Sequence, residues 1–179
     1  SMQGIDLRTV GSGGTGATNV LRTLGKKASA TVLVLDFLKG LLPVLAARWF
    51  GVEEWWVAAV AVATVIGHCW SPFIGFKGGK GVATGGGAAI ALFPLVLVVV
   101  PVILLIIWQT RYISLGSLIG AGLAVVLAVA AAAAGQLPWA FAVAIAAIAA
   151  IIVFRHRENI DRLRSGTERK FGEKLQVAG

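Results

Sequence analysis

Apolar residues run along this chain in long stretches that polar and glycine-rich segments interrupt. The first stretch covers about residues 28–50, and a second runs from about 54 to 70. Because a helix needs about 20 residues to cross the apolar layer of a bilayer, both stretches predict membrane spans. Apolar residues then continue over 82–108, where Phe93-Pro94 predicts a short helix, a break and a second helix.

Two more apolar stretches follow a brief polar connection at residues 111–114. They predict spans at about 115–134 and 139–154, and small residues crowd both, as close packing of helices in lipid requires. We therefore expect an all-α, polytopic membrane bundle with about six spans, some of them short or broken. Residues 1–179 are expected to form a single membrane-embedded domain.

Composition supports a membrane protein, because 58% of the residues are hydrophobic, only 13% are charged and the mean hydropathy is +0.87. The single cysteine, Cys69, excludes an internal disulfide, and two histidines leave no clustered metal ligands, so we expect neither a metal nor a cofactor. The net charge is +8, and the basic residues flank apolar stretches. Membrane lipid and phosphorylated substrates are therefore the expected partners, with no nucleic acid and no obligate protein partner.

The basic residues also predict the orientation of the chain in the membrane. Of the 16 Lys and Arg residues, all except Lys39 and Arg48 fall on one side when the chain is threaded through the predicted spans. Because positive loops stay on the cytoplasmic side, we expect this side and the C-terminus to be cytoplasmic. The glycine-rich loops fall on the same side, which predicts a single site there.

Residues 76–87, with the sequence FKGGKGVATGGG, form the segment around which we expect that site to be organised. Glycines let backbone N–H groups converge on phosphate oxygens, and Lys77 and Lys80 supply positive charge. Apolar sequence from Val82 places a helix N-terminus beside the glycines, which also favours an anion. The segment does not match the Walker A pattern. The alternative is a flexible juxtamembrane loop whose lysines extend to the membrane surface.

Three other polar features of the sequence are a second glycine-rich segment, a candidate ion pair and a histidine at the end of a span. Residues 11–19, with the sequence GSGGTGATN, predict a second loop that faces a ligand. Asp36 and Lys39 are three residues apart within the first span, so they can pair on one helical face, and we interpret them as a structural ion pair facing the interior. His68, at the end of the second span, is interpreted as a structural hydrogen-bonding residue.

Three segments together resemble the acyl-phosphate-dependent glycerol-3-phosphate acyltransferases of bacteria (PlsY). The first is residues 11–22, the second runs from Gly67-His68 to Thr84, and the third comprises Arg155 to Ile160 with residues 162–170. Their order and the spans between them cover nearly the whole chain.

The resemblance implies transfer of an acyl group from acyl phosphate to the 1-hydroxyl of glycerol 3-phosphate, giving lysophosphatidic acid and phosphate, at the bacterial inner membrane. It also implies roles for individual residues. The catalytic residues would be Ser12, Arg22, His156 and Asn159; the substrate and phosphate site would comprise Gly78, Gly79, Lys80, Gly81 and Thr84; and Glu168 would be structural.

The sequence departs from the family pattern in places. Gly14 stands where the family usually has Asn, and the usual Pro of the second motif comes one place late, at Pro72 behind Ser71. The family also has one more span ahead of the first motif. That span is absent here, and we expect a truncation.

The sequence does not identify the group that accepts the proton. The acyl-CoA acyltransferases use a His-x4-Asp dyad, but here Phe73 stands five residues after His68, where the Asp would be. Either His156 is the base, or a substrate phosphate takes the proton while Ser12, Asn159 and backbone N–H groups hold developing charge. Ser114 either caps the helix that follows it or contacts substrate, and we include it in the candidate substrate site. The alternative function is a small transporter or channel for organic phosphates, although the sequence shows no internal repeat.

Overall fold

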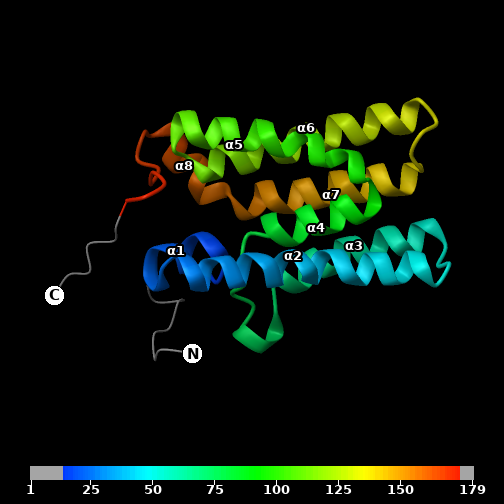
Figure 1. Ribbon diagram of the computed structural model, residues 1–179, viewed down its shortest axis with the longest axis horizontal. Helices are drawn as coiled ribbons and strands as arrows, with labels where there is room; N and C mark the ends of the chain where they lie inside the picture. The colour runs from blue at the N-terminus through cyan, green and yellow to red at the C-terminus, as the bar shows by residue number, and fades with distance from the viewer. Residues whose placement is uncertain (1–13, 174–179) are drawn as a thin grey trace.

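The computed structural model describes residues 14–173, which fold into a bundle of α-helices (Figure 1). No strand occurs within this range, so the predicted all-α class is confirmed. In chain order, the elements are α1 (Ala17–Leu24), α2 (Lys26–Trp49), α3 (Glu54–Cys69), η1 (Pro72–Ile74), α4 (Val82–Leu92), η2 (Pro94–Val98), α5 (Val99–Thr110), α6 (Ile113–Ala133), α7 (Trp139–Arg155) and α8 (Arg157–Arg164).

The predicted apolar segments are all helical in the structure, but they differ in length. Among the described residues, α2, α6 and the segment Glu54–Ile74 are long and apolar enough to cross a membrane. A fourth span results if α7 is counted together with α8, which is bent by 60° from it. The predicted break is present, since α4 ends at Leu92 and η2 begins at Pro94. With 11 residues, α4 extends only about 16 Å, roughly half of the apolar layer.

Glycine allows α4 to lie directly against α2. A Cβ added to Gly40 on α2 would lie 1.9 Å from the carbonyl oxygen of Thr84, and one added to Gly87 on α4 would lie 2.2 Å from that of Phe37. Neither position has room for a larger residue. This contact holds the N-terminus of α4 beside the turn of α2 that carries Asp36.

Small residues also allow α6 to approach α5, as the sequence predicted for the later spans. A Cβ added to Gly120 on α6 would lie 2.4 Å from Cδ1 of Ile103 on α5. In lipid, such close approach increases van der Waals contact between helices, because the hydrophobic effect contributes little there. Gly120 therefore contributes to the packing of α6 against α5.

Arg48 has a structural role at the end of the bundle opposite α1 and α8. Because α4 ends inside the bundle, its last carbonyl groups need partners other than water. Arg48 Nη1 donates to the carbonyl oxygens of Ala91 and, at 3.5 Å, Leu92. The Arg48 guanidinium also lies 5.6 Å from the ring centroid of Phe141 on α7.

The hydrophobic core lies mainly between α3, α4 and α7. Ala61, Val65, Leu92, Ile145 and Ile148 are each at most 3% exposed. At one end of this core lie α1, α8 and the start of α4 (Figure 1). The three motif segments therefore meet at one end of the bundle.

Candidate active site

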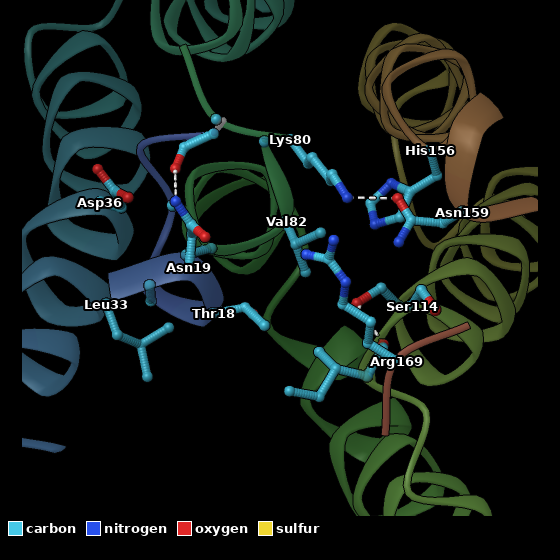
Figure 2. A pocket seen from close by; sticks show the side chains of 18 of the residues that line it. Thr18, Asn19, Leu33, Asp36, Lys80, Val82, Ser114, His156, Asn159 and Arg169 are labelled. Carbon is cyan, nitrogen blue, oxygen red and sulfur yellow. Dashed lines mark hydrogen bonds between the residues drawn. The ribbon is translucent and has the colours of Figure 1, made fainter. Parts of the chain in front are cut away.

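A cavity of about 220 Å³ lies at this end of the bundle, and residues from all three motif segments line it. Arg22 comes from the first segment, Gly79, Lys80 and Gly81 from the second, and His156, Asn159, Arg162, Glu168 and Arg169 from the third. Figure 2 shows Lys80 and Asn159 extending toward one another, with Asn19 and Asp36 on the other side of the space. The folded chain therefore brings together residues that are more than 130 positions apart, as Arg22 and Asn159 are.

We define residues 78–81 as the glycine loop, which joins the α3 side of the bundle to α4. Gly78 N–H donates to Cys69 O at 3.2 Å, and a Cβ added to Gly78 would lie 1.9 Å from the carbonyl oxygen of His68. Gly81 has φ +79°, a left-handed conformation that favours glycine, and it directly precedes α4. The first N–H groups of α4 have no acceptor within the helix, so this loop and helix start can bind an anion.

Glu168 connects several polar side chains around the cavity. Its Oε1 accepts from Asn159 Nδ2 at 2.6 Å and from Ser114 Oγ at 2.7 Å, and its Oε2 accepts from Arg162 Nε at 2.8 Å. Asn159 Oδ1 in turn accepts a hydrogen bond from Lys80 Nζ. Burial alone would raise the pKa of Glu168, but these three donors lower it below its usual value, so the carboxylate stays charged.

The pKa values of Lys80 and His156 are shifted because Lys80 is partly buried and His156 is buried. Burial, with a smaller contribution from Arg162, lowers the pKa of Lys80 to about 8. Burial also lowers the pKa of His156 to about 4, so the imidazole is neutral at pH 7. His156 Nδ1 lies 2.8 Å from Ile152 O, and because a carbonyl only accepts, Nδ1 carries the hydrogen and Nε2 keeps its lone pair.

The first motif segment approaches the cavity through α1. Arg22 lines the cavity, and its Nη2 donates to Arg169 O at 3.4 Å, which ties α1 to the C-terminal segment. Asn19 is 3% exposed, and its Nδ2 donates to Gly14 O at 2.8 Å. Ser12, the other predicted catalytic residue of this segment, lies outside the described residues. The assignments of Arg22 and Ser12 to catalysis remain predictions.

Asp36 and Lys39 pair as expected, with Nζ 3.0 Å from Oδ1. The expectation that both face the interior is wrong for Lys39, because its side chain is 55% exposed whereas that of Asp36 is 10% exposed. Asp36 also lines the cavity, and its Oδ1 lies 3.4 Å from His68 Nδ1. His68 lines the cavity as well, so the two residues that we interpreted as structural are next to the candidate substrate site.

Of the other residues predicted for the substrate site, some line the cavity and others are buried away from it. Ser114 lines the cavity, as do Gly79 and Gly81. Gly78 is buried against the end of α3. Thr84 is completely buried in the contact between α2 and α4, and its Oγ1 has no hydrogen-bond partner among the described residues. Packing against α2 therefore keeps Thr84 away from the cavity, and a direct contact with substrate has no support in this geometry.

Sequence reasoning did not assign Arg162 and Arg169 to the site, although both line the cavity. For Arg162 a signal was available, because it lies three residues after Asn159 and hence on the same face of α8. No group of three His, Cys, Asp or Glu side chains suited to a metal ion occurs in residues 14–173. The cavity is lined by cationic side chains, carboxylates, histidines, amides and hydroxyl groups.

An apolar groove of about 110 Å³ adjoins the polar cavity. Val82 and Ser117 line both spaces. From there the groove extends between α4, α5, α6 and α7, where residues such as Ala89, Ile103 and Ala121 line it. An anionic group in the cavity and a hydrocarbon chain in the groove can therefore belong to one molecule.

Known proteins resemble this chain along most of its length. A sequence model of the family described as Glycerol-3-phosphate acyltransferase matches residues 1–166. The chain is 46% identical over 177 residues to Glycerol-3-phosphate acyltransferase 1 of Deinococcus radiodurans, and the alignment covers 97% of this chain and 86% of the relative. It is 49% identical over 169 residues to Glycerol-3-phosphate acyltransferase of Geobacter sulfurreducens, covering 94% of this chain and 85% of the relative.

Solved structures show the same fold. The crystal structure of PlsY (YgiH), an integral membrane glycerol 3-phosphate acyltransferase, in its glycerol 3-phosphate form matches with a TM-score of 0.87 and 44% identity, covering 96% of this chain and 84% of that one. Its lysophosphatidic acid form matches with a TM-score of 0.85 and 43% identity, covering 96% and 85%. By sequence and by fold, the chain belongs to the PlsY family of integral membrane glycerol-3-phosphate acyltransferases.

Proposed function

We propose that this glycerol-3-phosphate acyltransferase takes its acyl group from an acyl phosphate and transfers it to the 1-hydroxyl of glycerol 3-phosphate. The products are lysophosphatidic acid and inorganic phosphate. The observation that carries the proposal is the junction of the cationic cavity with the apolar groove at Val82 and Ser117. An acyl phosphate has a phosphate for the first space and a hydrocarbon chain for the second, with its reactive carbonyl at the junction.

Cationic groups around the cavity suit two phosphates at once. Arg22, Lys80, Arg162 and Arg169 line it, opposed by Asp36 and Glu168. We assign Lys80 and the glycine loop to the phosphate of glycerol 3-phosphate, because the loop adds backbone donors to the lysine charge. Arg22 is assigned to the donor phosphate, since a guanidinium can bind two phosphate oxygens in parallel.

In the reaction, the glycerol oxygen forms a bond to the acyl carbon, and the bond from that carbon to the phosphate oxygen breaks. Phosphate leaves with the electron pair, and the hydroxyl proton must be accepted. We propose that a substrate phosphate accepts it, because the pKa of about 4 makes His156 a weak base. His156 Nε2 then accepts a hydrogen bond and orients the hydroxyl, while the backbone N–H groups stabilise the developing oxyanion. Asn159 turns its amide oxygen toward Lys80, so it holds the ammonium group of Lys80 in place.

Product measurements with purified protein test the donor directly. Acyl phosphate and glycerol 3-phosphate together should release phosphate and form lysophosphatidic acid in equal amounts. Omission of glycerol 3-phosphate should abolish the release above the rate of spontaneous hydrolysis. Equal or faster product formation from acyl-CoA, in protein free of other acyltransferases, would refute the proposed donor.

We also propose that the cavity opens to the cytoplasm, on the basis of the distribution of basic residues. With Cys69 replaced by Ser, single cysteines at the exposed positions Lys77 and Glu53 can be labelled in intact cells. An impermeant probe should label the Glu53→Cys variant and leave Lys77→Cys protected until the cells are opened. The reverse pattern would invert the topology.

The alternative of a transporter for organic phosphates predicts a different result. A transporter would move labelled glycerol 3-phosphate across a vesicle membrane without chemical change. The polar cavity lies at one end of the bundle, beside the ends of the helices, which suits chemistry at the membrane surface better than passage through it. Uptake into protein-containing vesicles without formation of lysophosphatidic acid would favour the transporter.

A further inference from the structure

Arg155, at the end of α7, contacts the glycine loop from the side away from the cavity. Its Nε donates to Gly79 O at 3.2 Å and its Nη2 donates to Gly78 O at 3.1 Å. One guanidinium thus binds two successive carbonyl groups of the loop. Arg155 is absent from the residues that line the cavity, so its hydrogen bonds affect a bound phosphate only through the loop.

The direction of these carbonyl groups decides whether the loop can bind an anion. A peptide unit presents its N–H and its C=O on opposite sides, so a carbonyl bound to Arg155 turns the N–H of the next residue the other way. Gly79 and Lys80 follow the two carbonyls, and both line the cavity. A flipped peptide would instead direct a carbonyl dipole at the phosphate and repel it. Glycine makes such a flip easy, because no Cβ restricts its φ and ψ angles.

The Arg155 guanidinium is itself held in place by its neighbours. It lies 5.4 Å from the ring centroid of Trp70, which follows α3, and the Trp70 ring lies 6.2 Å from that of Phe154. The His68 ring also lies against the loop and fills the space next to Gly79, where a Cβ would lie 2.2 Å from Nε2. The loop is therefore confined by contacts with both Arg155 and His68.

We propose that Arg155 is a positioning residue that sets the peptide orientation of the glycine loop and thereby its affinity for the phosphate of glycerol 3-phosphate. This inference rests on the proposed function, because it takes the glycine loop as the phosphate site of the acceptor. The loop conformation matters equally in the ground state and the transition state. Loss of Arg155 should therefore raise the KM for glycerol 3-phosphate far more than it lowers kcat.

Three variants separate this role from simple loss of charge. Arg155→Met removes both donors and keeps the length of the side chain. Arg155→Lys keeps the charge, but a single ammonium group cannot reproduce the planar pair of donors. Arg157→Met is the matched control, because Arg157 also stacks on an aromatic ring, 5.0 Å from the centroid of Phe154, and no hydrogen bond joins it to the loop.

We expect Arg155→Met to raise the KM and the Kd for glycerol 3-phosphate about 10- to 100-fold, as loss of charge-assisted contacts does, with kcat at saturation changed less than about threefold. Arg155→Lys should show a smaller rise, and Arg157→Met should behave like the wild-type protein. Amide hydrogen exchange should become faster in residues 77–82 of Arg155→Met and stay unchanged in α6.

Either of two results would overturn the inference: equal KM values for Arg155→Met and Arg157→Met, or a wild-type KM for Arg155→Lys. If Arg155→Met does not fold, the Arg155→Lys comparison decides alone, since it keeps the charge. A different result would refute the proposed acyl donor: wild-type protein would bind glycerol 3-phosphate but would not react with acyl phosphate. In that case the Kd values of the variants for glycerol 3-phosphate still test the role of Arg155 in binding.

Discussion

Asn159 Nδ2 donates a 2.6 Å hydrogen bond to Oε1 of Glu168, and this contact determines which way the Asn159 amide faces. With its NH2 group committed to a carboxylate, Asn159 presents its oxygen to the ammonium group of Lys80. Glu168 therefore influences the cavity by orienting Asn159, and its side chain is only 6% exposed. The structural role that the family resemblance implied for Glu168 stays a prediction, and this contact supports it.

Lys80→Ala should raise the KM for glycerol 3-phosphate more than it lowers kcat, if the lysine holds the phosphate in both the ground state and the transition state. One charge-assisted hydrogen bond contributes roughly 1.5 to 3 kcal/mol, which corresponds to about a ten- to hundredfold change. Steady-state rates at varied glycerol 3-phosphate measure this split, with the exposed residue Lys77 replaced by Ala as the control. An unchanged KM would remove Lys80 from phosphate binding.

Binding of glycerol 3-phosphate should be accompanied by proton uptake near pH 8. The pKa of Lys80 is about 8 in the empty cavity, so about half of the lysine is neutral at that pH. A bound phosphate favours the charged form and raises this pKa, so a proton is taken up and affinity falls as the pH rises above 8. Calorimetry in buffers of different ionisation enthalpy measures the uptake.

The control for this proton uptake is Lys80→Met, which has no group to titrate there. The variant should bind more weakly and lose most of the uptake at pH 8. Uptake of the same size in Lys80→Met would assign the proton to another group.

His156→Gln should retain a sizeable fraction of kcat, because glutamine keeps a hydrogen-bonding group at this position. If a substrate phosphate accepts the proton, both proteins should lose activity near the second phosphate pKa of about 6. If His156 is the base, its pKa of about 4 places the acid limb of the wild type near pH 4, and loss of the base should cost about 10² to 10⁴-fold. A glutamine variant that is as inactive as His156→Ala and lacks the wild-type limb would identify His156 as the base.

The same pKa predicts how stability depends on pH. Because the folded pKa of His156 lies below the unfolded value of about 6.5, the unfolded state binds more protons between these two values. The contribution of neutral His156 to stability is therefore fully present above pH 6.5 and is lost as the pH falls toward 4. Unfolding measured over this range should show a weaker pH dependence in His156→Gln. An identical dependence in both proteins would contradict the buried neutral form.

Ala121→Leu should shift the donor preference toward shorter acyl chains. Ala121 on α6 lines the apolar groove, so three additional carbon atoms there reduce the space for a hydrocarbon chain. Competition between acyl phosphates of different chain length measures the preference. Ala130→Leu is the matched control, because this residue lies on the same helix and is exposed. If both variants show wild-type preference, the acyl chain does not occupy this groove.

Local sequence determined the helical bundle and much of the site. Helix formation depends on runs of apolar residues, so the apolar helices and the break at Pro94 could be read directly from the chain. The predicted number of about six spans was less accurate, because only three of the described helical segments, or four with α7 and α8 counted together, are long and apolar enough to cross a membrane. The Asp36–Lys39 pair followed from helical periodicity. The motif residues predicted a phosphate site at the glycine loop, since glycine, lysine and a helix start have this chemistry regardless of their surroundings.

Tertiary packing decided the rest, because contacts between distant segments leave no periodic signal in one sequence. Thr84 is buried because glycine on α2 allows close contact with α4, although its place in the motif predicted a contact with substrate. The apolar groove exists only between four packed helices, and Arg155 reaches the glycine loop only because α7 ends beside it. Likewise, the neutral state of His156 depends on burial by its neighbours, which the sequence of α7 and α8 does not specify.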